Sequence, residues 1–429
     1  MRLSLNHKLS FFALLLIATG ACTSSPSSPN DPGSGGNGGN GGSGGNGGGV
    51  VDDAGPGDAD PPPNLSCASG DKTAFEKALI EMPADSWATA GEGALAGATA
   101  TTFSAYCHTV QNPDLKLTSG CDAVVEGWGG AVTDGSRLFA WGGGHNDYGG
   151  NEVYVFDPAS MTWSLVTQPS KLTAADLGTD PLEDGQPNSR HTYDGLAFLG
   201  DKNEILAWGG STAPLGNSSQ RTWRLDLGAA AWHLADPGDT LPAEAAGHFW
   251  MGTDYDPATG TVWTVDDLGL LKYSVAEDKW TKVNQNLGKR GGYKRGVFDA
   301  RRSLFFAFGI TYDQVGDPIV NVIDVKTDGG PEVTSEWPLV VPMAQGPGAD
   351  IVPAEDAIYV WSGGAPLRIA LATKTVAPVS ADGAPSAACP QGTFGRWRYL
   401  KAYNVFILVN RAGEPVHFYK PSAACGPQP

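Results

Sequence analysis

From about Asp122 onward, the sequence repeats one pattern of short apolar runs separated by turns rich in glycine, aspartate, asparagine and proline. In the clearest copies the second run ends in a pair of glycines, the third carries a tyrosine or an equivalent residue before an aspartate, and the fourth carries a tryptophan. Short apolar runs bounded by turn residues are typical of β-strands. Repetition of a four-strand unit predicts a β-propeller in which every unit forms one blade.

The clearest copy of this unit runs from Val124 to Val166, and the second runs from His191 to Ala235. Weaker copies follow, beginning at His248, Tyr293, Gly348 and Thr393. The last copy lacks a fourth run, whereas Ser86-Trp87-Ala88 carries a tryptophan like the fourth runs elsewhere. We therefore expect strands from both ends of the chain to share the last blade, which would remove exposed sheet edges.

The copies predict an all-β fold with six four-stranded blades, and a seventh blade is an alternative if Glu92 to Val110 forms strands. A β-sandwich is a further alternative, but it predicts neither the repeat nor the glycine pairs. A helical pattern is expected only in a short segment near Thr73 to Ile80.

Three stretches resemble a large bacterial family of kelch-repeat propellers similar to the central domain of galactose oxidase: WGGGHNDYGGNEVYVFD, NSRHTYDGLAF and GTFGRWRYLKAYNVFILVN. The resemblance covers roughly Met82 to Pro421. It implies a kelch-type β-propeller. The family has no single assigned activity, so the resemblance implies a fold more than a function.

Residues 1–21 have the features of a secretory signal peptide, with basic residues before an apolar run from Leu9 to Ala18. That run is about half the ~20 residues of a membrane-spanning helix. The following Thr19-Gly20-Ala21-Cys22 resembles a bacterial lipobox, with Thr19 where a leucine-like residue is usual, and implies lipidation of Cys22.

Residues 22–63 are dominated by glycine, serine, proline and asparagine, which predicts a flexible tether, and residues 64–429 are then the propeller. We expect an exported lipoprotein of the bacterial cell envelope, on the periplasmic or surface face of the outer membrane. It would contact the membrane only through its lipid anchor.

The formal net charge is −18, from 46 acidic and 28 basic residues, and this charge repels nucleic acid. Without Cys22 the number of cysteines is odd, so at most two disulfides can form within the chain. The preferred pairs are Cys107 with Cys121 and Cys389 with Cys425, which leaves Cys67 free or competing. The cysteine spacing does not fit a zinc site.

In a propeller, the loop after the second strand of one blade and the loop before the first strand of the next open on the same face. This topology brings together the catalytic candidates His145, Arg190, His191 and Tyr193. Candidate ligand-binding residues begin the later blades: His248, Tyr293, Arg295, Arg396 and Arg398. Imidazoles, phenols and cations gathered on an acidic protein favour an anionic ligand, such as a uronate or sulfated sugar.

Structural roles are alternatives for the same residues. His145 would then only complete a turn, Asn151 and Glu152 would fix the start of a strand, and Arg190 with His191 would plug the channel. Arg396 and Arg398 alternate along a strand, so both would share one face and pair with aspartates such as Asp194. Most tryptophans would pack between blades; Trp128 and Trp250 are the better candidates for sugar platforms.

Two functions follow from this candidate site. The first is a polysaccharide lyase, since propeller lyases acting on uronate polymers are similar in using His, Tyr and Arg at the channel mouth. In β-elimination, Arg190 or Arg295 would neutralise the carboxylate, His145 or His191 would act as base, and Tyr193 would act as acid. The second is a non-catalytic module that binds a glycan or a protein.

Other chemistries have weaker support in the sequence. A copper radical site like that of galactose oxidase needs two late histidines, and only His417 is available. No spacing selects a carboxylate pair for hydrolysis, and no nucleophile elbow or phosphate loop is present. No cofactor is expected, although His145, His191 and His248 offer a zinc alternative if they meet on one face.

Overall fold

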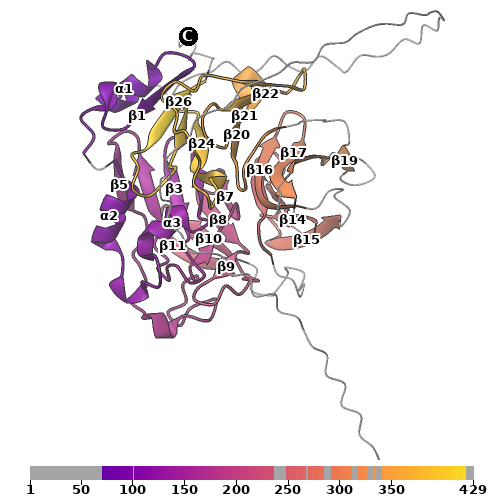
Figure 1. Ribbon diagram of the computed structural model, residues 1–429. Coiled ribbons are helices and arrows are strands. Elements are labelled where there is room, and N and C mark those ends of the chain that lie inside the picture. The colour runs from indigo at the N-terminus through magenta and orange to yellow at the C-terminus, as the bar shows by residue number, and fades with distance from the viewer. Residues whose placement is uncertain are drawn as a thin grey trace, which may run out of the picture. The chain divides into compact units, whose positions relative to one another are not determined.

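The computed structural model describes residues 70–99, 101–235, 248–266, 269–284, 291–311, 317–326, 332–334 and 341–421. The predicted signal peptide, Cys22, the tether and the expected start of the propeller at residue 64 lie outside this set. Within it, the strands form six four-stranded antiparallel sheets, which are the predicted blades (Figure 1). No helix among the described residues is both long enough and apolar enough to span a membrane.

We number the blades in chain order and call the first strand of each blade its inner strand. Blade 1 consists of β2 (Gly130–Thr133), β3 (Leu138–Trp141), β4 (Tyr154–Asp157) and β5 (Thr162–Leu165). Blade 2 consists of β7 (Leu196–Leu199), β8 (Glu204–Trp208), β10 (Thr222–Asp226) and β11 (Ala231–Ala235). Blade 3 consists of β12 (Gly252–Asp256), β13 (Thr261–Val265), β14 (Leu270–Ser274) and β15 (Lys279–Asn284).

Blade 4 consists of β16 (Gly291–Asp299), β17 (Leu304–Thr311), β18 (Pro318–Asp324) and β19 (Glu332–Thr334). Blade 5 consists of β20 (Gly348–Val352), β21 (Ala357–Trp361), β22 (Leu367–Ala370) and β23 (Thr375–Pro378). Blade 6 consists of β24 (Trp397–Leu400), β25 (Val405–Leu408), β26 (His417–Lys420) and β1 (Ser86–Thr89). A separate two-stranded sheet pairs β6 (Arg190–His191) with β9 (Ser211–Thr212).

The ring is closed by strands from both ends of the chain, as predicted. Strand β1 pairs antiparallel with β26, with Trp87 opposite Tyr419. The inner strands contact one another in the cyclic order β2, β7, β12, β16, β20 and β24, and β24 contacts β2 again. Every blade therefore has a neighbour on each side.

Neighbouring inner strands approach one another too closely for a side chain where they begin or just before. A Cβ on Gly130 would collide with the carbonyl oxygen of Tyr193, and one on Gly395 would collide with that of Ala131. Only glycine fits such an approach of two backbones.

The hydrophobic core is divided among the interfaces between neighbouring blades. Trp232 of the outer strand β11 packs on Trp141 of blade 1 at 5.0 Å between ring centroids. Trp280 of β15 packs in the same way on Trp208 of blade 2 at 4.7 Å. In both cases the tryptophan of the fourth strand packs against the neighbouring blade, so its large apolar area stabilises the interface between the two sheets.

The helices precede blade 1 or lie in connecting loops. The α-helices are α1 (Ala74–Ile80), α2 (Phe103–Val110) and α3 (Ala123–Glu126). The 3₁₀ helices are η1 (Gly93–Leu95), η2 (Pro113–Leu115), η3 (Gly120–Asp122), η4 (Ala174–Asp176), η5 (Pro353–Glu355) and η6 (Phe394–Arg396). The helical pattern expected near residues 73–80 is confirmed as α1, which Thr73 caps.

The alternative of a seventh blade in residues 92–110 is wrong, because this segment contains η1 and α2. Thr102 caps α2 by accepting a hydrogen bond from the amide of Ala105. Phe103 and Cys107 are spaced i, i+4 and are both buried, as on one face of a helix. The ring of Phe103 packs edge-on against Trp163 of β5 at 5.0 Å, so α2 covers the outer part of blade 1.

One of the preferred disulfides is present, between Cys107 and Cys121. It connects α2 to η3. Cys389 is buried, but its expected partner Cys425 lies outside the described residues, as does Cys67.

Candidate functional site

Three of the predicted catalytic residues come together where the inner strands begin. His145 lies in the turn after β3, and His191 lies in β6, just before the inner strand of blade 2. Their rings are 5.3 Å apart, and the ring of His191 is 6.2 Å from that of Tyr193. Tyr193 in turn contacts Tyr293 of blade 4 at 6.3 Å, so the group reaches across the channel mouth.

His191 is held by a carboxylate. Its Nε2 lies 3.0 Å from Oδ2 of Asp147, whose Oδ1 accepts a hydrogen bond from Ser119 at 2.9 Å. His191 is 2% exposed, and burial lowers its pKa, although Asp147 opposes the shift. The imidazole is therefore neutral near pH 7, and its Nε2–H donates to Asp147.

The pKa of Asp147 is lowered. Burial acts to raise it, but the hydrogen bonds from His191 and Ser119 and the charge interaction with His191 outweigh that effect. Asp147 is thus the fixed anion of the pair, and it sets both the orientation and the tautomer of His191.

His145 is the accessible histidine of the group. Its side chain is exposed, its backbone is in the left-handed region at φ 44°, and its amide donates to the carbonyl of Ser211. Its ring packs over Gly216, where a Cβ would lie 2.6 Å from the imidazole Cδ2. The fold therefore places this ring beside His191, which goes beyond the predicted alternative of a residue that only completes a turn.

Five aromatic residues surround the same mouth; four of them are candidates from the sequence, and Phe394 is not. We call them the aromatic collar: Trp128, Tyr193, Trp250, Tyr293 and Phe394. Each lies within three residues of the start of an inner strand, and each has φ between 46° and 56°. The sixth equivalent position is Gly346, at φ 57°, where the ring of Phe394 occupies the space that a Cβ would need.

Backbone hydrogen bonds and ring contacts join the collar. The amide of Tyr193 donates to the carbonyl of Trp128 at 2.8 Å, and that of Gly346 donates to the carbonyl of Tyr293 at 3.1 Å. The rings of Trp250 and Tyr293 are 5.4 Å apart, and that of Trp128 is 4.9 Å from His191. Phe394 and Tyr193 are buried, whereas Trp128, Trp250 and Tyr293 are only half-buried.

Bulky side chains at positive φ are uncommon and cost about 1–2 kcal/mol each. Such strain gathers at functional sites, where the surrounding structure imposes it. A signal for the collar was present in the sequence as an aromatic residue just before a glycine at the start of most repeats, for example in Tyr193-Asp194-Gly195. Four of these residues were named separately from the sequence, Tyr193 and Tyr293 as site residues and Trp128 and Trp250 as sugar platforms, but they were not connected as one repeated position, and Phe394 was not included.

The predicted arginines have structural contacts within the propeller and are fully or almost fully buried. Arg190 donates to Asp180 at 2.7 Å and lies over the ring of Trp141. Arg396 donates to the carbonyl oxygens of Gly129, Val409, Asn410 and Gly392.

These buried polar groups connect neighbouring blades. Arg396 and Arg398 of blade 6 donate to carbonyls that begin blade 1, and Arg295 of blade 4 donates to carbonyls of blades 3 and 5. Asp194 accepts from Arg295 and from backbone amides of blades 3 and 4. Asp350 joins blade 5 to blade 6 through the amide of Tyr399. Arg190 also donates to backbone carbonyls, as in the predicted plug, and Arg398 lies 4.0 Å from Asp350, whereas the hydrogen bonds given above for Arg396 go to carbonyls and not to the expected aspartate.

Arg398 lies farther along the channel than the collar. It lines a cavity of about 330 Å³ with Asp254 and Asp350, near the other ends of the inner strands. It is therefore not part of the group formed by the histidines.

His248 forms a second histidine–aspartate pair. Its Nδ1 is 2.6 Å from Oδ2 of Asp266, and both side chains are buried. Within the described part of the chain, its Nε2 has no hydrogen-bond partner. His145, His191 and His248 do not bring three ligand atoms together among the described residues; the group that does so is near the disulfide.

Comparison with known proteins adds little to this geometry. No family model matches the chain. Among solved structures, TolB from Acinetobacter baumannii is similar over 64% of this chain and 56% of the TolB chain, at 12% identity and a TM-score of 0.37. The propeller assignment accordingly stands on the strand pairing described above.

Proposed function

We propose that the protein is a glycan-binding propeller whose ligand lies on the aromatic collar beside His145. The observation that carries the proposal is the set of half-buried rings of Trp128, Trp250 and Tyr293 around the channel mouth. Sugar rings present an apolar face that packs on aromatic side chains, while histidine and tyrosine supply hydrogen bonds to hydroxyl groups.

The two arginines expected to neutralise a carboxylate are already paired with aspartates, and this pairing determines which class of glycan we propose. Arg190 and Arg295 are completely buried and donate to Asp180 and Asp194, so their charge is already compensated. They are poorly placed to select a carboxylate or a sulfate. We therefore propose that stacking, rather than charge, dominates, and that an acidic group on the glycan is not required.

Binding to a glycan array, followed by calorimetry with the best glycan, tests this proposal. Trp128→Ala and Trp250→Ala should each weaken binding by about tenfold, which corresponds to about 1.4 kcal/mol for a lost stacking contact. Phe198→Ala is the matched control, because Phe198 is half-buried at the other end of the channel. Equal binding by all three variants would reject the collar as the site.

A polysaccharide lyase is the second candidate, and the pair of His191 and Tyr193 favours it. Burial lowers the pKa of His191 and raises that of Tyr193, so a neutral imidazole lies beside a protonated phenol. These are the states that a base and an acid need for β-elimination. The expected mechanism uses Arg190 or Arg295 to neutralise the carboxylate of the uronate. Both arginines are buried and already paired with aspartates.

The absorbance of unsaturated uronates, followed during incubation with acidic polysaccharides, distinguishes the two candidates. A signal that His191→Ala and Tyr193→Phe both abolish would favour the lyase. Glycan binding without any such signal would favour the binding module. His233→Ala is the matched control, since His233 is exposed on β11, away from the channel.

We also propose that Cys22 is lipidated and that the protein is held in the cell envelope by residues 22–63. The sequence features before and after Cys22 support this proposal together. Mass spectrometry of the protein isolated from membranes tests it, because a diacylglycerol on Cys22 and loss of residues 1–21 give a defined mass.

A further inference from the structure

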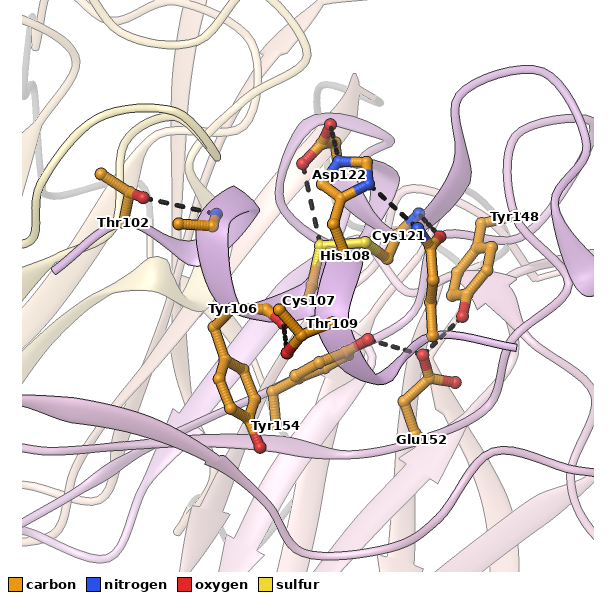
Figure 2. Close-up of a disulfide and its surroundings, with 12 residues drawn as sticks. Thr102, Tyr106, Cys107, His108, Thr109, Cys121, Asp122, Tyr148, Glu152 and Tyr154 are labelled. Atoms are coloured by element: carbon orange, nitrogen blue, oxygen red, sulfur yellow. Dashed lines mark hydrogen bonds and ion pairs between the residues drawn. A yellow bond between two sulfur atoms is a disulfide. The ribbon is translucent and has the colours of Figure 1, made fainter. Parts of the chain in front are cut away.

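The disulfide lies in a cluster of four side chains that are all ligands suited to zinc. Cys107 and Cys121 are each followed directly by a second donor, His108 and Asp122 (Figure 2). One ligand atom from each of the four residues lies within 4.8 Å of the others. The spacing of the cysteines alone gave no sign of this, because the two Cys–donor pairs are 14 residues apart and only the fold brings them together.

The distances are close to those of a tetrahedral ion, and a small rotation of Asp122 would let one of its oxygens face both partners. With zinc bonds of about 2.3 Å to sulfur and about 2.0 Å to nitrogen or oxygen, neighbouring ligand atoms are about 3.3 to 3.8 Å apart. His108 Nε2 is 3.0 Å from Asp122 Oδ2, and Cys107 Sγ is 3.8 Å from Asp122 Oδ1. The Cα atoms of the two cysteines are 6.0 Å apart, so side-chain rotation can separate the sulfurs once the disulfide is reduced.

Gln111 supports the imidazole from behind. Its side-chain amide lies 2.9 Å from Nδ1 of His108, and this contact directs Nε2 towards Asp122. With zinc on Nε2, the Nδ1 of His108 carries a proton and needs an acceptor, so the amide of Gln111 would turn and give up the hydrogen bond that its Oε1 accepts from the amide of Cys121 at 3.3 Å. The cysteines are buried, whereas His108 is 44% exposed, so an ion can reach the cluster from solvent.

We propose that this cluster is a redox-gated zinc site: Cys107, Cys121, His108 and Asp122 bind Zn²⁺ when the cysteines are reduced, and the disulfide replaces the ion when they are oxidised. A dithiol reductant transfers two electrons and two protons to the cysteines and leaves as its own disulfide. Zinc then displaces both thiol protons and binds two thiolates, one carboxylate and one neutral imidazole. Either state ties α2 to η3.

The test uses the full chain, reduced with a dithiol and desalted without oxygen, with Zn²⁺ as the probe in competition with a chromogenic chelator. The reduced wild-type protein should bind one zinc ion more than Cys107→Ser/Cys121→Ser does. The oxidised wild-type protein should not bind this ion. His108→Ala and Asp122→Asn should weaken binding by tenfold or more, since even outer partners of zinc ligands contribute about 10–100-fold.

His233→Ala and Asp114→Asn are matched controls, because both residues are exposed and lie outside the cluster. They should bind zinc as the wild type does. Equal zinc content in the wild-type and double-serine proteins would overturn the proposal. Loss in the double-serine protein alone, with His108→Ala and Asp122→Asn unaffected, would also overturn the four-ligand site. The two single variants keep both cysteines, so the test survives if the double variant does not fold.

Discussion

The buried pair of Asp194 and Arg295 gives a direct test of whether the channel arginines stabilise the fold or bind a ligand. Oδ2 of Asp194 accepts from Arg295 at 3.0 Å and from the amides of Thr253 and Gly296 at 2.9 and 2.8 Å. Neither side chain of the pair is more than 1% exposed. Removing one member leaves the other without its nearest opposite charge, which costs up to about 3–5 kcal/mol; Asp254 and Asp350 still interact with Arg295, and Arg398 still interacts with Asp194.

We therefore expect Arg295→Met to lower the free energy of unfolding by up to about 3–5 kcal/mol. Asp194→Asn should lower it by a similar or smaller amount, because the amide oxygen can still accept from the backbone. The double variant should be more stable than the sum of the two changes predicts, since neither buried charge is then left unpaired.

Equilibrium urea unfolding, followed by tryptophan fluorescence, measures these changes. Arg368→Met is the control, because Arg368 is 31% exposed and pairs with Glu355 at 3.2 Å, so its loss should cost at most about 1 kcal/mol. If Arg295→Met unfolds like the wild type but abolishes glycan binding, Arg295 binds the ligand and our assignment of a structural role is refuted.

Further predictions concern ring closure, pH and the collar. Trp87→Ala should cost about 3–5 kcal/mol in urea unfolding, because Trp87 packs between Trp397 and Tyr419 in the closing blade; an unchanged midpoint would contradict closure by β1. Because the pKa of His191 is lowered by folding, the unfolded state binds more protons than the folded state once the pH falls below about 6.5. The free energy of unfolding should therefore decrease from that pH down to the pKa of His191 in the folded protein. His191→Gln should flatten this dependence between about pH 7.5 and 5.5, and an unchanged slope would contradict the prediction. Trp250→Gly should have a free energy of unfolding about 1 kcal/mol higher than Trp250→Ala, because a φ of 56° suits glycine. At Trp232, which lies in an ordinary strand, the alanine variant should instead be the more stable of the two.

The blades could be predicted because their signals are local. A strand, a glycine pair, a tyrosine and a tryptophan lie within one repeat, and Ser86-Trp87-Ala88 supplied the missing strand by the same pattern. Residues 92–110 were open to the wrong alternative of a seventh blade. There, Phe103 and Cys107 follow a helical spacing over too short a segment to outweigh the repetition around it.

The approach of His145 to His191 was also predictable, because propeller topology alone puts both loops on one face. The partners of the arginines were not, since Asp194 lies about a hundred residues from Arg295 along the chain. A sequence shows that a cation is present, but the fold decides whether a carboxylate has already compensated it. The zinc-type cluster was missed for the same reason, because its two adjacent pairs, Cys107-His108 and Cys121-Asp122, come together only through the fold.

The aromatic collar links these findings. Glycine adopts a φ near +50° without strain, and Gly346 does so at the sixth position of the ring. At the other positions the chain carries aromatic rings, each at a cost of about 1–2 kcal/mol in backbone strain. Burial can repay that cost for Tyr193 and Phe394, which are enclosed, but it does so only in part for Trp128, Trp250 and Tyr293, which still expose part of their apolar surface. The apolar area that folding leaves uncovered on these three rings is the area that a sugar would cover, and for this reason we place the ligand on the collar rather than on the buried arginines.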